Sequence, residues 1–134
     1  MEFMSGRSHK ELPVNPEVEV AVAEQTLVLE QGHIYVHCYF KNGGEENLIR
    51  IWKSTVIIDK VSGIRAPLSH IENITYAPTW TRVPINTTYR FLLIFEALPS
   101  TCVAFDLLED IPEPGGFFVG GILRNQTDVY HVQL

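Results

Sequence analysis

The sequence predicts an all-β protein: an antiparallel β-sandwich of two sheets, with about seven to nine strands and little or no helix. Several segments alternate apolar and polar residues, which is the period of a strand with one buried face. Turn-forming Gly, Pro and Asn residues separate these segments at intervals of about eight to twelve residues, as in sandwiches and barrels. No long segment shows the period of an amphipathic helix.

The length of the chain, 134 residues, suits one domain with a full hydrophobic core. We expect residues 1–16 to be a flexible N-terminal tail and residues 17–134 to form a single β-sandwich domain. Glu2 and Phe3 ahead of Met4 are typical of a cloning remnant at residues 1–3. If a signal peptide or an upstream domain preceded Met4 in the natural protein, the chain as given lacks it. An extracytoplasmic location is compatible with a removed signal peptide, so the compartment stays open.

Composition argues against two classes of partner. The formal net charge is -6 and Lys and Arg form no cluster, so we expect no nucleic-acid binding. The longest apolar run, Phe91–Phe95, has the length of a buried strand, and we expect no membrane insertion.

The first half of the predicted domain contains short segments of strand type. The clearest is His33–Phe40, where apolar residues at every second position from Ile34 onward share one face. Lys41–Gly44 follows as a turn, because Asn and Gly tolerate positive φ. We expect strands here at residues 17–22, 26–29, 33–40, 48–52 and 55–58.

Residues 64–86 are expected to be irregular and to lie along a sheet edge. Pro67, Pro78 and Pro84 have no backbone N–H to donate, which argues against a long central strand. A short strand is expected near Arg82–Pro84, and Leu68–Glu72 is where a short helical turn fits.

Regular alternation returns in the second half. Val103, Phe105 and Leu107 are expected to share the core face of their strand. Ile111–Gly116 predicts a rigid turn, and Gly120-Gly121 a bulge. The expected strands are residues 89–97, 102–109, 117–124 and 129–134.

Cys38, Trp52 and Cys102 have a spacing close to that of the inter-sheet disulfide and packed Trp of antibody-type domains. Ser100, however, stands where those domains carry a Tyr. Alternation also puts Cys102 on the face opposite the predicted core. We favour two free thiols, one of them buried, and leave the pairing open.

No motif for catalysis or metal binding is complete. His33 and His37 share a strand face, but roughly 13 Å separates them, too far for one zinc ion. Ser69–Glu72 lacks the strained turn that a nucleophilic Ser needs, and we expect a surface loop there. We therefore predict no enzyme, no cofactor and no metal site.

Two further sets of polar residues have structural explanations. One set of acids lacks the spacing of a calcium loop and is expected to form a solvated rim: Asp106, Glu109, Asp110 and Glu113. Asn73, Asn86 and Asn125 begin glycosylation sequons, which we attribute to the preference of Asn and Thr for turns.

Aromatic residues are the remaining candidates for a binding surface. Tyr35, His37 and Tyr39 share the polar face of one predicted strand, and Tyr76 and Trp80 lie in the proline-rich stretch. Exposed aromatic side chains often mark a face that binds protein or stacks on carbohydrate. The alternative is that they pack beneath residues 64–86.

Three segments also carry a resemblance to a known class of domain: Phe91–Pro99, Phe105–Glu109 and Gly116–Ile122. The second half of the chain resembles small immunoglobulin-like β-sandwich domains of uncharacterised bacterial proteins, of a kind found in Bacteroidetes. The resemblance extends over most of residues 17–134. It implies a fold, but no reaction and no site residues.

Three functional hypotheses follow, in order of preference. The first is a non-enzymatic interaction module that binds another protein or a companion domain, since the core is well patterned and no catalytic set is complete. The second is a carbohydrate-binding module that uses Trp80, Tyr76, Tyr35 and Tyr39 as stacking platforms. The third, an enzyme of unrecognised type, is the least favoured.

Overall fold

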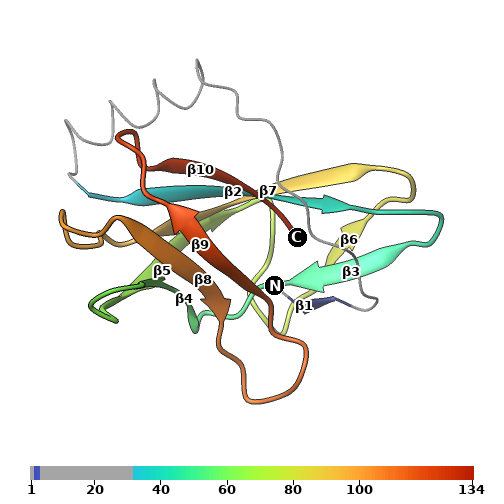
Figure 1. Ribbon diagram of the computed structural model, residues 1–134. Helices are drawn as coiled ribbons and strands as arrows, with labels where there is room; N and C mark the ends of the chain where they lie inside the picture. The colour runs from blue at the N-terminus through green and yellow to red at the C-terminus, as the bar shows by residue number, and fades with distance from the viewer. Residues whose placement is uncertain (1, 4–31) are drawn as a thin grey trace.

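The computed structural model describes residues 2–3 and 32–134, which contain ten β-strands and no helix (Figure 1). The all-β prediction is therefore confirmed. Nothing in these ranges qualifies as a membrane-spanning helix. The strands are β1 (Glu2–Phe3), β2 (Ile34–Lys41), β3 (Asn47–Arg50), β4 (Thr55–Asp59), β5 (Arg65–Glu72), β6 (Thr81–Val83), β7 (Thr88–Phe95), β8 (Ala104–Glu109), β9 (Phe118–Leu123) and β10 (Val129–Gln133).

The strands form two sheets. A three-stranded sheet has the order β1-β3-β6, and a seven-stranded sheet has the order β10-β2-β7-β5-β4-β8-β9. Paired strands are antiparallel except for β10 and β2, which run parallel with His131 opposite His37. The pairing is mainly antiparallel, as expected, whereas the sandwich of two facing sheets stays a prediction.

The seven-stranded sheet folds back on itself at β5. Pro67 pairs with Val56 of β4, whereas residues from Leu68 onward pair with β7, and the register shifts between Leu68 and His70. A bulge of this kind bends a strand. The β10-β2-β7 half consequently faces the β4-β8-β9 half, and the sheet is nearly closed like a barrel (Figure 1).

The core lies between these two halves. Along β2, every second residue from Ile34 onward is fully buried and the intervening residues are partly exposed. Ile34 and Val36 join Phe91, Phe95 and Phe105 in one hydrophobic cluster, as the alternation predicts. Burial of each such side chain contributes about 1.5–3 kcal/mol, so this interior is the main source of stability.

The prediction for residues 64–86 is wrong in its first part. β5 is an eight-residue strand inside the sheet, and Leu68–Glu72 forms no helical turn. Pro67 is tolerated because its carbonyl accepts a hydrogen bond from the Glu96 N–H, just past the end of β7. The missing N–H of Pro67 therefore faces the residue just beyond the end of β7, where no ladder hydrogen bond is lost. The expected short strand is present as β6.

Two predictions fail at strand ends. Glu2–Phe3, expected within a tail, pairs with β3 through its backbone. β8 begins only at Ala104, so the alternation does not reach back to the preceding residues: Val103 is exposed and Cys102 is buried. The remainder of the predicted tail and the strands expected at residues 17–22 and 26–29 lie outside the described residues.

Candidate functional site

The residues of the predicted aromatic surface lie in two places. Tyr35, His37 and Tyr39 are on the outward face of β2, and Tyr76 and Trp80 are in the connection between β5 and β6. All five side chains are partly buried. The fold therefore does not gather them into one open aromatic face.

On the outward face of β2, the side chains contact a neighbour that sequence spacing did not reveal. His131 of β10 stacks on His37, with ring centroids 4.8 Å apart, and its Nδ1 lies 2.7 Å from the Tyr39 hydroxyl. Only the parallel pairing of β10 with β2 brings these residues together. His37, Tyr39 and His131 thus form a packed cluster of rings, which we call the ring cluster.

Both imidazoles of this cluster are held in the neutral form. Burial, together with the nearby His131 and Arg90, lowers the pKa of His37 to about 4. Burial and Arg90 also lower the pKa of His131. Near neutral pH the cluster therefore adds no positive charge to the surface.

Trp80 and Tyr76 lie against two basic side chains, those of Arg50 and Lys53. The Arg50 guanidinium lies 3.9 Å from the ring centroid of Trp80 and 5.8 Å from that of Trp52. The Lys53 ammonium lies 5.2 Å from the ring centroid of Tyr76. One face of the Trp80 ring and one face of the Tyr76 ring are thus close to a cation. These contacts hold the β5–β6 connection against β3 and the residues that follow it.

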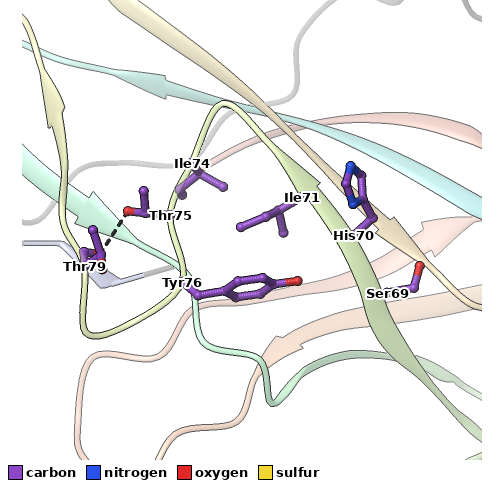
Figure 2. Close-up of a pocket in the computed structure, with 7 residues that line it drawn as sticks. All are labelled: Ser69, His70, Ile71, Ile74, Thr75, Tyr76 and Thr79. Atoms are coloured by element: carbon purple, nitrogen blue, oxygen red, sulfur yellow. Dashed lines mark hydrogen bonds between the residues drawn. The ribbon is translucent and has the colours of Figure 1, made fainter.

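A cleft opens beside Tyr76 (Figure 2). It has a volume of about 460 Å³ and is lined by residues of β5 and of the β5–β6 connection. The Tyr76 side chain extends across it, with the hydroxyl directed to the side where Ser69 and His70 lie. Of the predicted binding residues, only Tyr76 lines this cleft.

Ser69, His70 and Glu72, expected in a loop, are instead exposed residues of β5. The Ser69 hydroxyl donates a hydrogen bond to the carbonyl of Ile94, and His70 Nε2 lies 4.0 Å from Glu72. Ser69 therefore makes no nucleophile–base pair with His70 in this geometry, because its proton is directed to a backbone oxygen.

β9 forms the edge of the seven-stranded sheet, and no other strand in the described part of the chain pairs with its second side. The residues that lie opposite one another across four strands form an apolar row on the outer face of the sheet: Pro67, Val56, Leu108 and Phe118. Phe118 is 55% exposed and Leu123, near the end of β9, is 77% exposed. Sequence analysis did not identify this edge, because the order of the strands in the sheet decides which strand lies at the edge.

The solvated rim that was expected near β8 is present only in part, because Asp110 and Glu113 are exposed whereas Asp106 is partly buried. Glu109 is buried, and burial raises the pKa of its carboxyl group. Asp106 accepts a hydrogen bond from the Gly121 N–H at 2.8 Å and lies 3.4 Å from the Lys60 ammonium. Gly121 has a φ of 68° where the β8–β9 register shifts, which confirms the predicted bulge.

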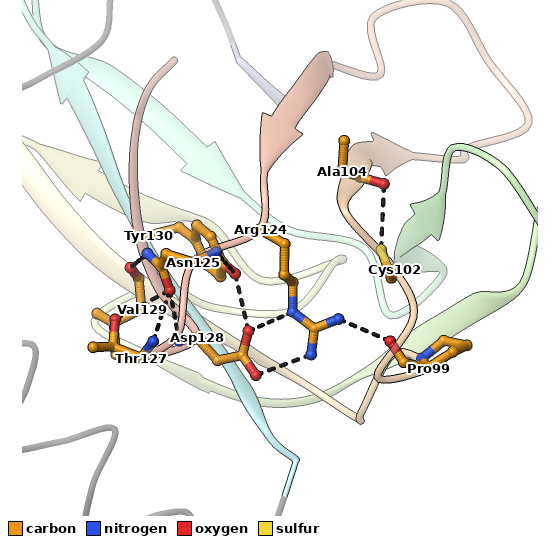
Figure 3. A network of polar contacts seen from close by, with 9 residues as sticks. All are labelled: Pro99, Cys102, Ala104, Arg124, Asn125, Thr127, Asp128, Val129 and Tyr130. Atoms are coloured by element: carbon orange, nitrogen blue, oxygen red, sulfur yellow. Dashed lines mark hydrogen bonds and ion pairs between the residues drawn. The ribbon is translucent and has the colours of Figure 1, made fainter.

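A polar cluster fixes the turn between β9 and β10 (Figure 3). Arg124 makes a bidentate ion pair with Asp128, at 2.6 and 3.0 Å, and donates to the Pro99 carbonyl at 3.0 Å. The Tyr130 hydroxyl donates to Asp128, and the Asn125 carboxamide oxygen accepts from the Asp128 N–H. This cluster, which we call the β9–β10 clasp, positions the end of β9.

All three sequon asparagines occupy turns, as their interpretation as turn residues requires. Asn73 and Asn86 have positive φ, at 66° and 53°. Asn125 caps the β9–β10 turn through its side chain.

Both cysteines are buried and free, and burial raises the pKa of each thiol.

Within residues 2–3 and 32–134, no three His, Cys, Asp or Glu side chains are grouped closely enough to hold a metal ion. Comparison with known proteins finds no match to a protein family, a curated protein or a solved structure.

Proposed function

We propose that this chain is a non-enzymatic interaction module that pairs an extended segment of a partner protein with the edge of β9. The observation that supports this proposal is the edge of β9, which is unpaired among residues 2–3 and 32–134 and carries exposed apolar side chains, Phe118 and Leu123, at its two ends. Addition of a strand to a sheet edge is a common mode of peptide recognition.

The backbone of β9 supplies the hydrogen-bonding groups for such pairing. The Glu109 N–H donates to the Phe117 carbonyl, and the Arg124 N–H donates to the Val103 carbonyl. Because backbone groups of successive residues point to opposite edges of a strand, those of Phe118 and Leu123 point away from β8. A partner strand would satisfy them.

The outer face of the sheet supplies side-chain contacts. Val56 and Leu108 are partly exposed next to Phe118, so the apolar row continues inward from the edge. A partner strand with apolar residues at alternate positions would extend this row. The bulge at Gly121 divides the edge into two short stretches, which disfavours continuous self-pairing of the kind that leads to aggregation.

Selection from a displayed library of random peptides on the immobilised chain tests this function. We expect selected peptides to be extended and apolar at alternate positions, and Phe118→Lys to weaken their binding about tenfold or more. Ile85→Lys is the matched control, because Ile85 is similarly exposed, at 50%, in the β6–β7 connection. Equal binding by wild type and Phe118→Lys would contradict the proposal, and so would a dimer of the chain itself that Phe118→Lys dissociates.

We further propose that the fold is immunoglobulin-like and related to the small bacterial domains that the sequence resembles. Support comes from two facing layers joined by the bend in β5, and from the mainly antiparallel pairing. An experimental structure in which β5 pairs with only one of β4 and β7 would contradict it.

A further inference from the structure

The cleft beside Tyr76 is largely open to solvent, and its lining suits contact with one face of a small molecule (Figure 2). Its volume is about 460 Å³. Ile71 and Ile74 give it an apolar side. Ser69, Thr79 and the Tyr76 hydroxyl add groups that can donate or accept hydrogen bonds.

Backbone hydrogen bonds hold the loop that carries Tyr76. The Ile51 N–H donates to the Thr75 carbonyl at 2.9 Å, and the Ala77 N–H donates to the Ile51 carbonyl at 2.8 Å. The Thr79 N–H donates to the carbonyl of Tyr76 itself at 3.0 Å. Because these bonds hold the loop before a ligand binds, little free energy would be lost in ordering Tyr76 on binding.

The chemistry of the lining selects the class of ligand. The seven lining residues include no carboxylate, Lys or Arg. The Lys53 ammonium lies 5.2 Å from the centroid of the Tyr76 ring, so a ligand would stack on the other face of the ring. An aromatic ring and two isoleucines beside several hydroxyl groups match a molecule with one apolar face and a hydroxyl-rich rim. A sugar ring has this character, and aromatic side chains are suited to stack on its apolar face.

We propose that this cleft binds a neutral sugar ring, with Tyr76 as the stacking residue and Ser69, His70 and Thr79 as hydrogen-bonding residues. The site is distinct from the β9 edge, since β5 and β9 are separated by β4 and β8 in the sheet. A free saccharide and a glycan on a protein present the same ring chemistry. Because the cleft and the β9 edge are separate, sugar binding at the cleft and peptide binding at β9 can be tested independently.

Nuclear magnetic resonance of the full chain, titrated with N-acetylglucosamine, maltose, cellobiose and lactose, tests the proposal. We expect at least one sugar to give saturable shifts at Tyr76, Ile71 and Thr79, with a dissociation constant of about 1 mM or tighter. Tyr76→Ala should weaken binding about tenfold, whereas Tyr76→Phe keeps the ring and should retain most of the affinity. Phe118→Ala, which removes an exposed ring elsewhere, should leave sugar binding unchanged.

If Tyr76→Ala does not fold, Thr79→Arg narrows the mouth of the cleft from an exposed position and should weaken binding similarly. A test glycoprotein, before and after enzymatic deglycosylation, distinguishes a protein-linked glycan from a free saccharide. Absence of saturable cleft shifts with all four sugars would overturn the proposal, as would shifts confined to the Tyr35 and Tyr39 face. Peptide binding at β9, measured on the same Tyr76→Ala sample, should remain at the wild-type level.

Discussion

The ring of Phe105 on β8 packs edge-on against the ring of Tyr130 on β10, with centroids 4.9 Å apart and planes at 85°. These strands belong to opposite halves of the curled sheet, so the contact joins the two halves across the core. The Tyr130 hydroxyl also donates to Asp128 at 2.9 Å. One residue thus links the hydrophobic interior to the β9–β10 clasp.

Phe105→Ala should lower the free energy of unfolding by about 3–5 kcal/mol, because it opens a cavity between the two halves and removes the contact with Tyr130. Urea denaturation measures this loss. Phe118→Ala, at an exposed site of the adjacent strand, is the matched control and should change stability by about 0.5 kcal/mol or less. Equal losses for the two variants would show that the two halves do not share one interior.

Arg124→Met should destabilise the chain by about 3 kcal/mol, because Asp128 would keep a largely buried charge without its partner. Arg124→Lys should recover only part of the loss, since an ammonium cannot reproduce the bidentate pair and the contact with Pro99 together. Thermal unfolding compares these variants with Arg65→Met, which breaks an exposed pair with Asp110 and should cost little. Full recovery by Lys would argue against the clasp geometry.

Acidification from pH 7 to pH 5 should destabilise the protein through His37. Its pKa is lowered from 6.5 to about 4 in the folded chain, so below pH 6.5 the unfolded chain binds a proton that the folded chain excludes. The stabilisation is complete above this pH and declines toward pH 4, by at most about 1.4 kcal/mol per pH unit. His131, Arg90, Tyr39 and Glu72 are the titratable or charged groups near this imidazole.

Urea denaturation at several pH values isolates the contribution of this imidazole. His37→Gln should reduce the loss of stability at acid pH, because the titrating group is gone. His70→Gln, at an exposed position of β5, should retain the wild-type pH dependence. If wild type and His37→Gln have the same pH profile, the ring cluster is not packed as described.

Both thiols should resist modification in the folded protein. The thiolate is the reactive form, and burial raises the pKa of Cys38 and of Cys102. A chromogenic thiol reagent should therefore react slowly with native protein and label two thiols rapidly in denaturant. Fast labelling of the native chain would contradict the burial, and the absence of thiols in denaturant would reveal a disulfide.

Much of the fold could be predicted from the alternation of apolar and polar residues along single strands. β2 shows why: its buried and exposed positions follow directly from the period of His33–Phe40. β5 shows the limit, because Pro67 argued against an internal strand. The missing N–H is harmless only where the neighbouring strand has already ended, and that position depends on the long-range register between β5 and β7.

The candidate sites were harder to predict because they arise between distant segments. His131 and His37 meet only through the parallel pairing of β10 with β2. Arg50 contacts Trp80 only because the β5–β6 connection returns to β3. Phe118 reads in the sequence as an ordinary strand residue, and its exposure follows from the position of β9 at the edge. Tyr76 could be named from the sequence because exposed aromatic side chains often mark a binding face.

Amide hydrogen exchange of β9, measured with and without a peptide selected on the chain, tests the proposed binding edge most directly. We predict that the amides of Phe118 and Leu123 exchange about tenfold or more slowly in the complex, that Phe118→Lys abolishes this protection, and that Ile85→Lys preserves it. Unchanged exchange along β9 in a saturated complex, or protection confined to another strand, would contradict the account.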